Sequence, residues 1–108
     1  MRESVLKYES AIHDALYTDF KKPVYESISS ETSIVVRELN LAIKKLEFWV
    51  RPKKVKASML NFPSRDYIYY EPYGTTLIIA PWNYPYQLAL TPLICAIEAG
   101  NTVVLQIL

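Results

Sequence analysis

The chain has 108 residues, a formal net charge of +1 and one cysteine. Its sequence shows no spacing typical of metal ligands, no internal repeat and no low-complexity tract. This pattern argues against a metal centre and against a repeat architecture. The near-neutral charge, the single cysteine and a start (Arg2-Glu3) without the apolar core of a signal peptide predict a cytoplasmic protein.

The first half of the chain predicts two amphipathic helices, because apolar residues recur there at helical spacing in two stripes. The stripes are Val5, Leu6, Tyr8, Ile12, Ala15 and Leu16, then Val35, Val36, Leu39, Ile43, Leu46, Trp49 and Val50. Pro23 separates the helices and Pro52 ends the second one. His13 has no second ligand candidate nearby, so we expect it on the surface.

A basic cluster and a tyrosine-rich run follow the helices. Residues 51–56 contain four basic side chains and fit either a nucleic-acid patch or a solvated linker. No aromatic platform or nucleic-acid fold accompanies the cluster, so we interpret it as a linker. Residues 67–70 predict a strand, which would be an exposed edge if it stayed unpaired.

From residue 75 the pattern is that of an α/β unit. Residues 75–80 form an apolar, β-branched run that suits a parallel strand covered on both faces. Pro81 and Pro85 break the run and leave Asn83 between them, where it is a natural helix N-cap. Helical spacing then runs from Tyr86 until Gly100, and residues 102–105 read as a second strand. This order predicts a right-handed parallel crossover.

Charge is distributed unevenly along the chain. Eleven of the twelve Lys and Arg residues precede residue 60, and from Pro72 onward the only charged side chain is Glu98. This half therefore reads as the core of a larger α/β domain. The alternative, a transmembrane segment over residues 75–98, is disfavoured by the interrupting Asn83, Gln87 and prolines.

The motif Ile79-Ala-Pro-Trp-Asn-Tyr-Pro85, followed by Ala96-Ile-Glu-Ala-Gly-Asn101, resembles the aldehyde dehydrogenase superfamily, closest to its class 3-like branch. Glu71-Pro-Tyr-Gly74 and Asp19-Phe-Lys-Lys-Pro23 are similar to other family segments. The resemblance covers about the first quarter of a family member. It implies a helical segment (residues 1–60), a linker or strand toward the oligomerisation sheet (61–74), and the first strand-helix-strand of a truncated Rossmann-like dinucleotide-binding domain (75–108).

The resemblance also implies roles for individual residues. Asn83 matches the family asparagine whose amide stabilises the oxyanion formed when a cysteine thiolate attacks the aldehyde; its alternative role is the helix cap. Four residues match positions lining the cofactor cleft: Ile79, Ala80, Pro81 and Trp82. Gln106 stands where the family has a lysine that contacts the adenosine ribose. Cys95 does not match the catalytic cysteine and is expected to be a buried structural thiol.

The sequence thus predicts a fragment of an NAD(P)-dependent aldehyde dehydrogenase, inactive alone because the catalytic cysteine and glutamate are absent. The departure at Gln106 is typical of a truncated or frameshifted product. The competing hypothesis is a non-catalytic remnant that docks on other subunits through its helices and the strand at residues 67–70. For the full-length family the resemblance implies NAD or NADP, an aldehyde substrate and a homo-oligomer, with neither nucleic acid nor membrane as a partner.

Overall fold

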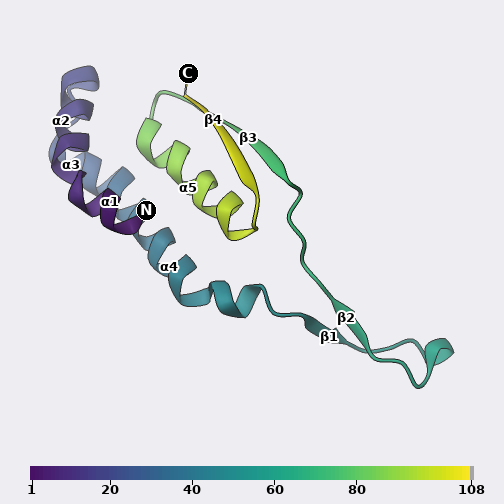
Figure 1. Ribbon diagram of the computed structural model, residues 1–108. Coiled ribbons are helices and arrows are strands. Elements are labelled where there is room, and N and C mark those ends of the chain that lie inside the picture. The colour runs from purple at the N-terminus through teal and green to yellow at the C-terminus, as the bar shows by residue number, and fades with distance from the viewer. Residues whose placement is uncertain (108) are drawn as a thin grey trace.

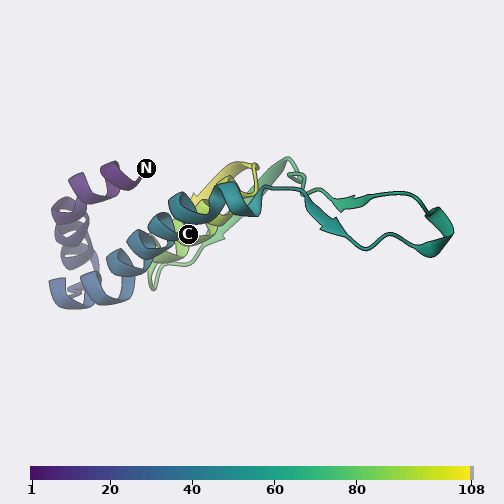
Figure 2. The same cartoon turned by 90° about the horizontal axis from the view of Figure 1, so that it is seen from below.

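The computed structural model describes residues 1–107. The molecule is elongated, with principal extents of 64 × 25 × 19 Å. Figure 1 shows the helices and one parallel strand pair gathered at one end, while a β-hairpin projects from the other. Figure 2, a view turned by 90°, shows the same separation.

The first predicted helix is divided in two. Helix α1 (Arg2–Lys7) and helix α2 (Glu9–Phe20) meet at Tyr8, whose φ of −101° and ψ of 11° interrupt the regular backbone. Lys21 then takes a left-handed conformation, with φ 55°, and ends α2. The buried residues of these helices are Val5, His13 and Leu16. The expectation that His13 lies on the surface was therefore wrong.

A longer helical stretch follows Pro23. It comprises α3 (Val24–Ser27), a π-helical turn η1 (Ile28–Thr32) and α4 (Ser33–Trp49). A π-turn widens a helix by one residue and changes which side chains face inward. Glu31 and Thr32 lie in this turn and are buried, although the sequence pattern did not single out either residue.

The projecting hairpin contains β1 (Lys53–Val55) and β2 (Asp66–Ile68), which pair antiparallel with Lys54 opposite Tyr67. A 3₁₀ turn, η2 (Met59–Asn61), lies between the strands. The linker prediction for residues 51–56 was correct about exposure but missed strand β1. The tyrosine-rich strand is paired, and it begins and ends slightly earlier than expected.

The α/β unit agrees closely with its prediction. Strand β3 (Thr75–Ala80), helix α5 (Pro85–Glu98) and strand β4 (Thr102–Ile107) follow in order, and β3 pairs parallel with β4. Gly100, with φ 80°, lies between α5 and β4, as expected of a residue that ends a helix. The mixed α/β class is confirmed.

The sheet is covered on one face only within residues 1–107, in contrast to the two-sided cover that its apolar pattern suits. Exposure alternates along β3, with Leu77 and Ile79 exposed and Ala80 buried. The buried side packs on α5, whose opposite side packs on α4. The core between the helices consists of Val5, Val35, Leu39, Ala42 and Ile94. Across the described residues, no helix is both long and apolar enough to cross a membrane.

Candidate functional site

The residues that the sequence singled out gather at one edge of the parallel sheet. Ile79 and Ala80 end strand β3, and Gln106 lies opposite Ile79 near the end of β4. Residues 81–83 continue from β3 toward α5. Ligands of open α/β sheets bind outside the carboxyl ends of the strands, so this edge is the expected place for a site.

The exposure of these residues separates them into two groups. Pro81, Trp82 and Asn83 are exposed, and Ile79 and Gln106 are exposed on the open face of the sheet. Ala80 has no accessible surface, because its side chain lies on the covered face. Ala80 therefore offers no accessible surface to a ligand, while the side chains of the other residues are free to make contact.

The backbone amides at the N-terminus of α5 donate to a residue distant in sequence rather than to the predicted cap. The helix begins at Pro85, and its N-cap residue is Tyr84, which makes no side-chain cap hydrogen bond within the described residues. The prediction that Asn83 caps the helix was therefore wrong. Instead, the amides of Tyr86 and Gln87 donate to Glu31 Oε2, at 3.0 and 3.1 Å. A carboxylate at this position also interacts favourably with the helix dipole.

Glu31 is itself neutralised by a buried lysine. Lys22 Nζ lies 2.5 Å from Glu31 Oε1, and the two side chains are 7% and 0% exposed. The same ammonium group lies 3.4 Å from the backbone carbonyl oxygen of Asn83 and 4.2 Å from the centre of the Tyr84 ring. Lys22 thus contacts the turn that carries Asn83, and Glu31 contacts the first turn of α5 that follows it.

A second polar contact holds the π-helical turn in place. His13 Nε2 lies 3.0 Å from Thr32 Oγ1, and both residues are buried. Nearby, burial and then the carboxylates of Glu9 and Glu31 raise the pKa of Tyr86 to about 12. The phenol therefore stays neutral at physiological pH.

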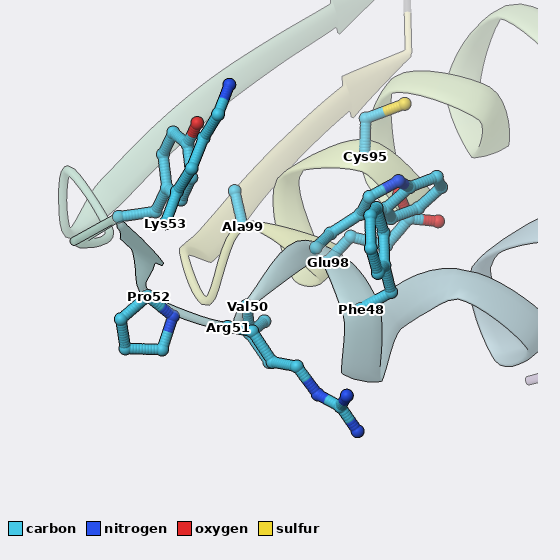
Figure 3. Close-up of a pocket in the computed structure, with 10 residues that line it drawn as sticks. Phe48, Val50, Arg51, Pro52, Lys53, Cys95, Glu98 and Ala99 are labelled. Carbon is cyan, nitrogen blue, oxygen red and sulfur yellow. The ribbon is translucent and has the colours of Figure 1, made fainter. Parts of the chain in front are cut away.

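Cys95 lies toward the other end of α5. It lines an open cavity of about 780 Å³ between α5 and the end of α4. Figure 3 shows Cys95, Glu98 and Ala99 on one side of this cavity and Phe48 and Val50 on the other. Cys95 is exposed, so the prediction of a buried thiol was wrong.

The chemistry of Cys95 does not fit a nucleophile. Partial desolvation, and then the charge of Glu98, raise the pKa of its thiol. Cys95 lies ten residues after Pro85 along the helix, roughly 15 Å away at about 1.5 Å per residue, so Cys95 cannot share a reacting atom with Asn83. Among residues 1–107, no group of three or more His, Cys, Asp and Glu residues could hold a metal ion.

Comparison with known sequences finds aldehyde dehydrogenases, by family profile and by individual relatives. The profile described as "Aldehyde dehydrogenase family" matches residues 2–107. The chain is 44% identical over 106 residues to 4,4'-diaponeurosporen-aldehyde dehydrogenase of Staphylococcus aureus, covering 98% of this chain and 23% of that protein. It is 45% identical over 98 residues to aldehyde dehydrogenase family 3 member I1, chloroplastic, of Arabidopsis thaliana, covering 91% of this chain and 18% of that protein.

Comparison with solved structures extends this result to three dimensions. The structure titled "Substrate bound state of Staphylococcus Aureus AldH" has a TM-score of 0.93 and 45% identity, covering 96% of this chain and 23% of that one. A succinic semialdehyde dehydrogenase from Streptococcus pyogenes, solved with NADP+, has a TM-score of 0.84 at 16% identity, covering 99% of this chain and 22% of that one; this likeness concerns the fold alone. The chain spans about a fifth to a quarter of the length of these relatives.

Proposed function

The chain belongs to the aldehyde dehydrogenase family, close to its class 3 members, and from this premise we propose that it supplies the N-terminal part of an NAD(P)-dependent aldehyde dehydrogenase. The proposed reaction oxidises an aldehyde to a carboxylic acid through a cysteine thiohemiacetal. The chain alone is inactive under this proposal. Its sequence contributes an oxyanion-stabilising amide and part of a cofactor cleft, but no catalytic cysteine or glutamate.

The observation that carries the proposal is the placement of Asn83. Its side chain is exposed in the turn between the carboxyl end of β3 and the N-terminus of α5. A side-chain amide there can donate a hydrogen bond to the oxygen that gains negative charge when a nucleophile attacks a carbonyl carbon. The contact of Lys22 with the Asn83 carbonyl, and that of Glu31 with the first turn of α5 directly after it, support a fixed position for the donor.

Other exposed residues at this edge of the parallel sheet have side chains suited to contact one side of a dinucleotide. Ile79 and Trp82 offer apolar surface, and the Gln106 amide can hydrogen-bond a ribose hydroxyl. When bound, NAD or NADP would supply the acceptor for the hydride that leaves the substrate. Gln106 supplies no positive charge for a phosphate, unlike the lysine of the family pattern.

The first prediction is that the chain alone binds the cofactor weakly. Each missing hydrogen bond to a charged group removes about 1.5–3 kcal/mol, so the loss of three turns micromolar binding into binding weaker than about a millimolar. Calorimetry with millimolar NAD or NADP is expected to show no saturable heat, and Gln106→Lys alone is not expected to restore it. Saturation below about 100 micromolar would contradict this prediction.

The proposed reaction is tested by placing residues 2–107 in the matching segment of the Staphylococcus aureus relative. The hybrid enzyme is expected to oxidise aldehydes, because the two folds superpose closely. Asn83→Ala in the hybrid is expected to lower kcat by about 10²–10³-fold, the typical effect of removing one oxyanion donor. Asn40→Ala, which changes an exposed asparagine on α4, is the matched control.

Two outcomes would contradict the proposal. One is a hybrid in which Asn83→Ala leaves kcat unchanged while the protein stays folded. The other is aldehyde-dependent formation of NADH or NADPH by the chain alone.

A second candidate function is docking on other subunits, and the shape of the hairpin favours it. The hairpin projects away from the helices at the other end of the molecule (Figures 1 and 2). The exposed fractions of Tyr67, Tyr69 and Tyr70 on and beyond β2 are 43%, 66% and 67%. Aromatic side chains on a projecting strand suit an interface. Co-purification of the chain with a tagged full-length relative, lost on Tyr69→Ser and Tyr70→Ser, would support this candidate over a purely catalytic role.

A further inference from the structure

We propose that Lys22 and Glu31 are positioning residues that fix the Asn83 turn by clamping the first turn of α5. The inference rests on the role of Asn83 proposed above. It assigns to the N-terminal segment a function beyond packing, because Lys22 lies in the connection between α2 and α3 and Glu31 lies in the π-helical turn η1.

The first step of the argument concerns the free amides of α5. Pro85 has no backbone N–H, and the amide of Leu88 already donates to the carbonyl of Tyr84 at 2.9 Å. The amides of Tyr86 and Gln87 remain, and both donate to the same carboxylate oxygen of Glu31. Glu31 thus satisfies the donors that a local cap would otherwise satisfy.

The second step concerns the charge of that carboxylate. A fully buried carboxylate is unfavourable unless it is paired and hydrogen-bonded. Lys22 supplies the pairing through Glu31 Oε1, so the two carboxylate oxygens contact different partners. The pair therefore joins the segment after α2 to the start of α5 in one connected polar network.

The third step links this network to Asn83. Lys22 Nζ approaches the Asn83 carbonyl oxygen at 3.4 Å and lies over the ring of Tyr84. These contacts hold the backbone of the turn and leave the Asn83 side chain exposed. Because the contacts fix the backbone of Asn83 and leave its side-chain amide without a partner to displace within residues 1–107, the arrangement is suited to presenting that side-chain amide to a ligand.

The experiment uses the full chain with three variants: Lys22→Met, Glu31→Gln and the two changes together. Hydrogen exchange at low micromolar concentration measures the amides of residues 86–87 against those of strand β4. In a Trp49→Phe background Trp82 is the remaining tryptophan, so its fluorescence anisotropy decay reports local motion beside Asn83. Glu47→Gln, which alters an exposed ion pair with Arg51, is the matched control.

In all three variants, exchange at Tyr86 and Gln87 is expected to rise about tenfold or more, while β4 stays within about twofold of wild type. The fast depolarisation of Trp82 is expected to increase as well. The double variant leaves no lone buried charge, so it decides the question if either single variant fails to fold. Equal loss of protection at all amides, or no change at residues 82–87, would overturn the proposal.

A kinetic measurement separates this inference from the proposed function. In the hybrid enzyme, the double variant is expected to lower kcat with little change in the KM for the cofactor. If the exchange and anisotropy results hold but Asn83→Ala leaves kcat unchanged, the proposed role of Asn83 fails and the clamp stands. If Asn83→Ala lowers kcat and the exchange results fail, the clamp alone is wrong.

Discussion

The thiol of Cys95 is accessible to solvent, and its surroundings raise its pKa. It lies on the rim of the cavity in Figure 3, close to Glu98 and partly screened from water. Both features disfavour the thiolate, which is the form that attacks electrophiles. The environment also raises the pKa of the Glu98 carboxyl, first by desolvation and then through Glu38.

We predict that Cys95 alkylation by iodoacetamide reaches its half-maximal rate at a higher pH than that of a free cysteine, about 8.5. The sign follows from the raised pKa of the thiol: at a given pH below it, less thiolate is present. Glu98→Gln is expected to move the midpoint downward, because it removes a nearby negative charge. A wild-type midpoint at or below that of glutathione would contradict the prediction.

At the element scale, the β3-α5-β4 unit depends on how α5 is connected to β4. Gly100 takes a φ of 80°, and its amide donates to the carbonyl of Ile97 at 2.9 Å. The next residue, Asn101, accepts a hydrogen bond from the amide of Gly74 at 3.0 Å, which joins the starts of the two strands. These hydrogen bonds therefore fix the end of α5 relative to the starts of β3 and β4.

Gly100→Ala is expected to lower the free energy of unfolding by about 1–2 kcal/mol, the cost of a left-handed conformation for an L-residue. The new methyl group would also lie 3.4 Å from Pro72 Cβ. Gly100→Asn is the matched control and is expected to lose less, because asparagine tolerates this conformation. Urea unfolding measures both, and equal stability of wild type and Gly100→Ala would refute the argument.

The strand-helix-strand order was predictable because its signals are local. The β-branched run of β3, the two prolines and Gly100 all lie within the elements they define or within two to four residues of them. The clamp on α5 was not predictable, because Glu31 lies 55 residues from Tyr86 in sequence. Its short stretch of serines and threonine gave no periodic signal, so neither the π-helical turn nor the buried pair could be inferred.

The errors at His13 and Cys95 have a related cause. His13 was expected on the surface because no second ligand candidate lies nearby, and Cys95 was expected to be buried because it does not match the catalytic cysteine; neither reason considers what packs against the residue. The actual burial depends on which partner each face meets. His13 meets Thr32, whereas Cys95 borders the open cavity near the end of α4.

At the scale of the whole molecule, the open face of the parallel sheet is the main apolar surface beside the proposed site. Leu77, Ile79 and Val104 have exposed fractions of 61%, 54% and 56%. Leu77 lies opposite Val104 in the register, so their side chains form one continuous patch. An exposed patch of this kind favours association with another apolar surface.

We predict that the isolated chain self-associates through this face. Sedimentation velocity across a concentration series is expected to show oligomers that decrease on the double substitution Leu77→Lys and Val104→Glu, whose new charges can pair across the strands. Leu60→Lys, at a residue 95% exposed in the hairpin, is the control and should change little. A wild-type chain that stays monomeric at all concentrations would contradict the prediction.

The distance in sequence between Glu31 and its helix-end partners has a consequence for synthesis on the ribosome. A growing chain exposes Lys22 and Glu31 well before it has made Tyr86 and Gln87, which lie 55 and 56 residues beyond Glu31. Until then no amide of α5 is present to donate a hydrogen bond to the Glu31 carboxylate, and burying the carboxylate would be unfavourable. We therefore expect the N-terminal helices to complete their packing only after α5 has emerged from the ribosome, so that the folding of this segment lags behind its synthesis.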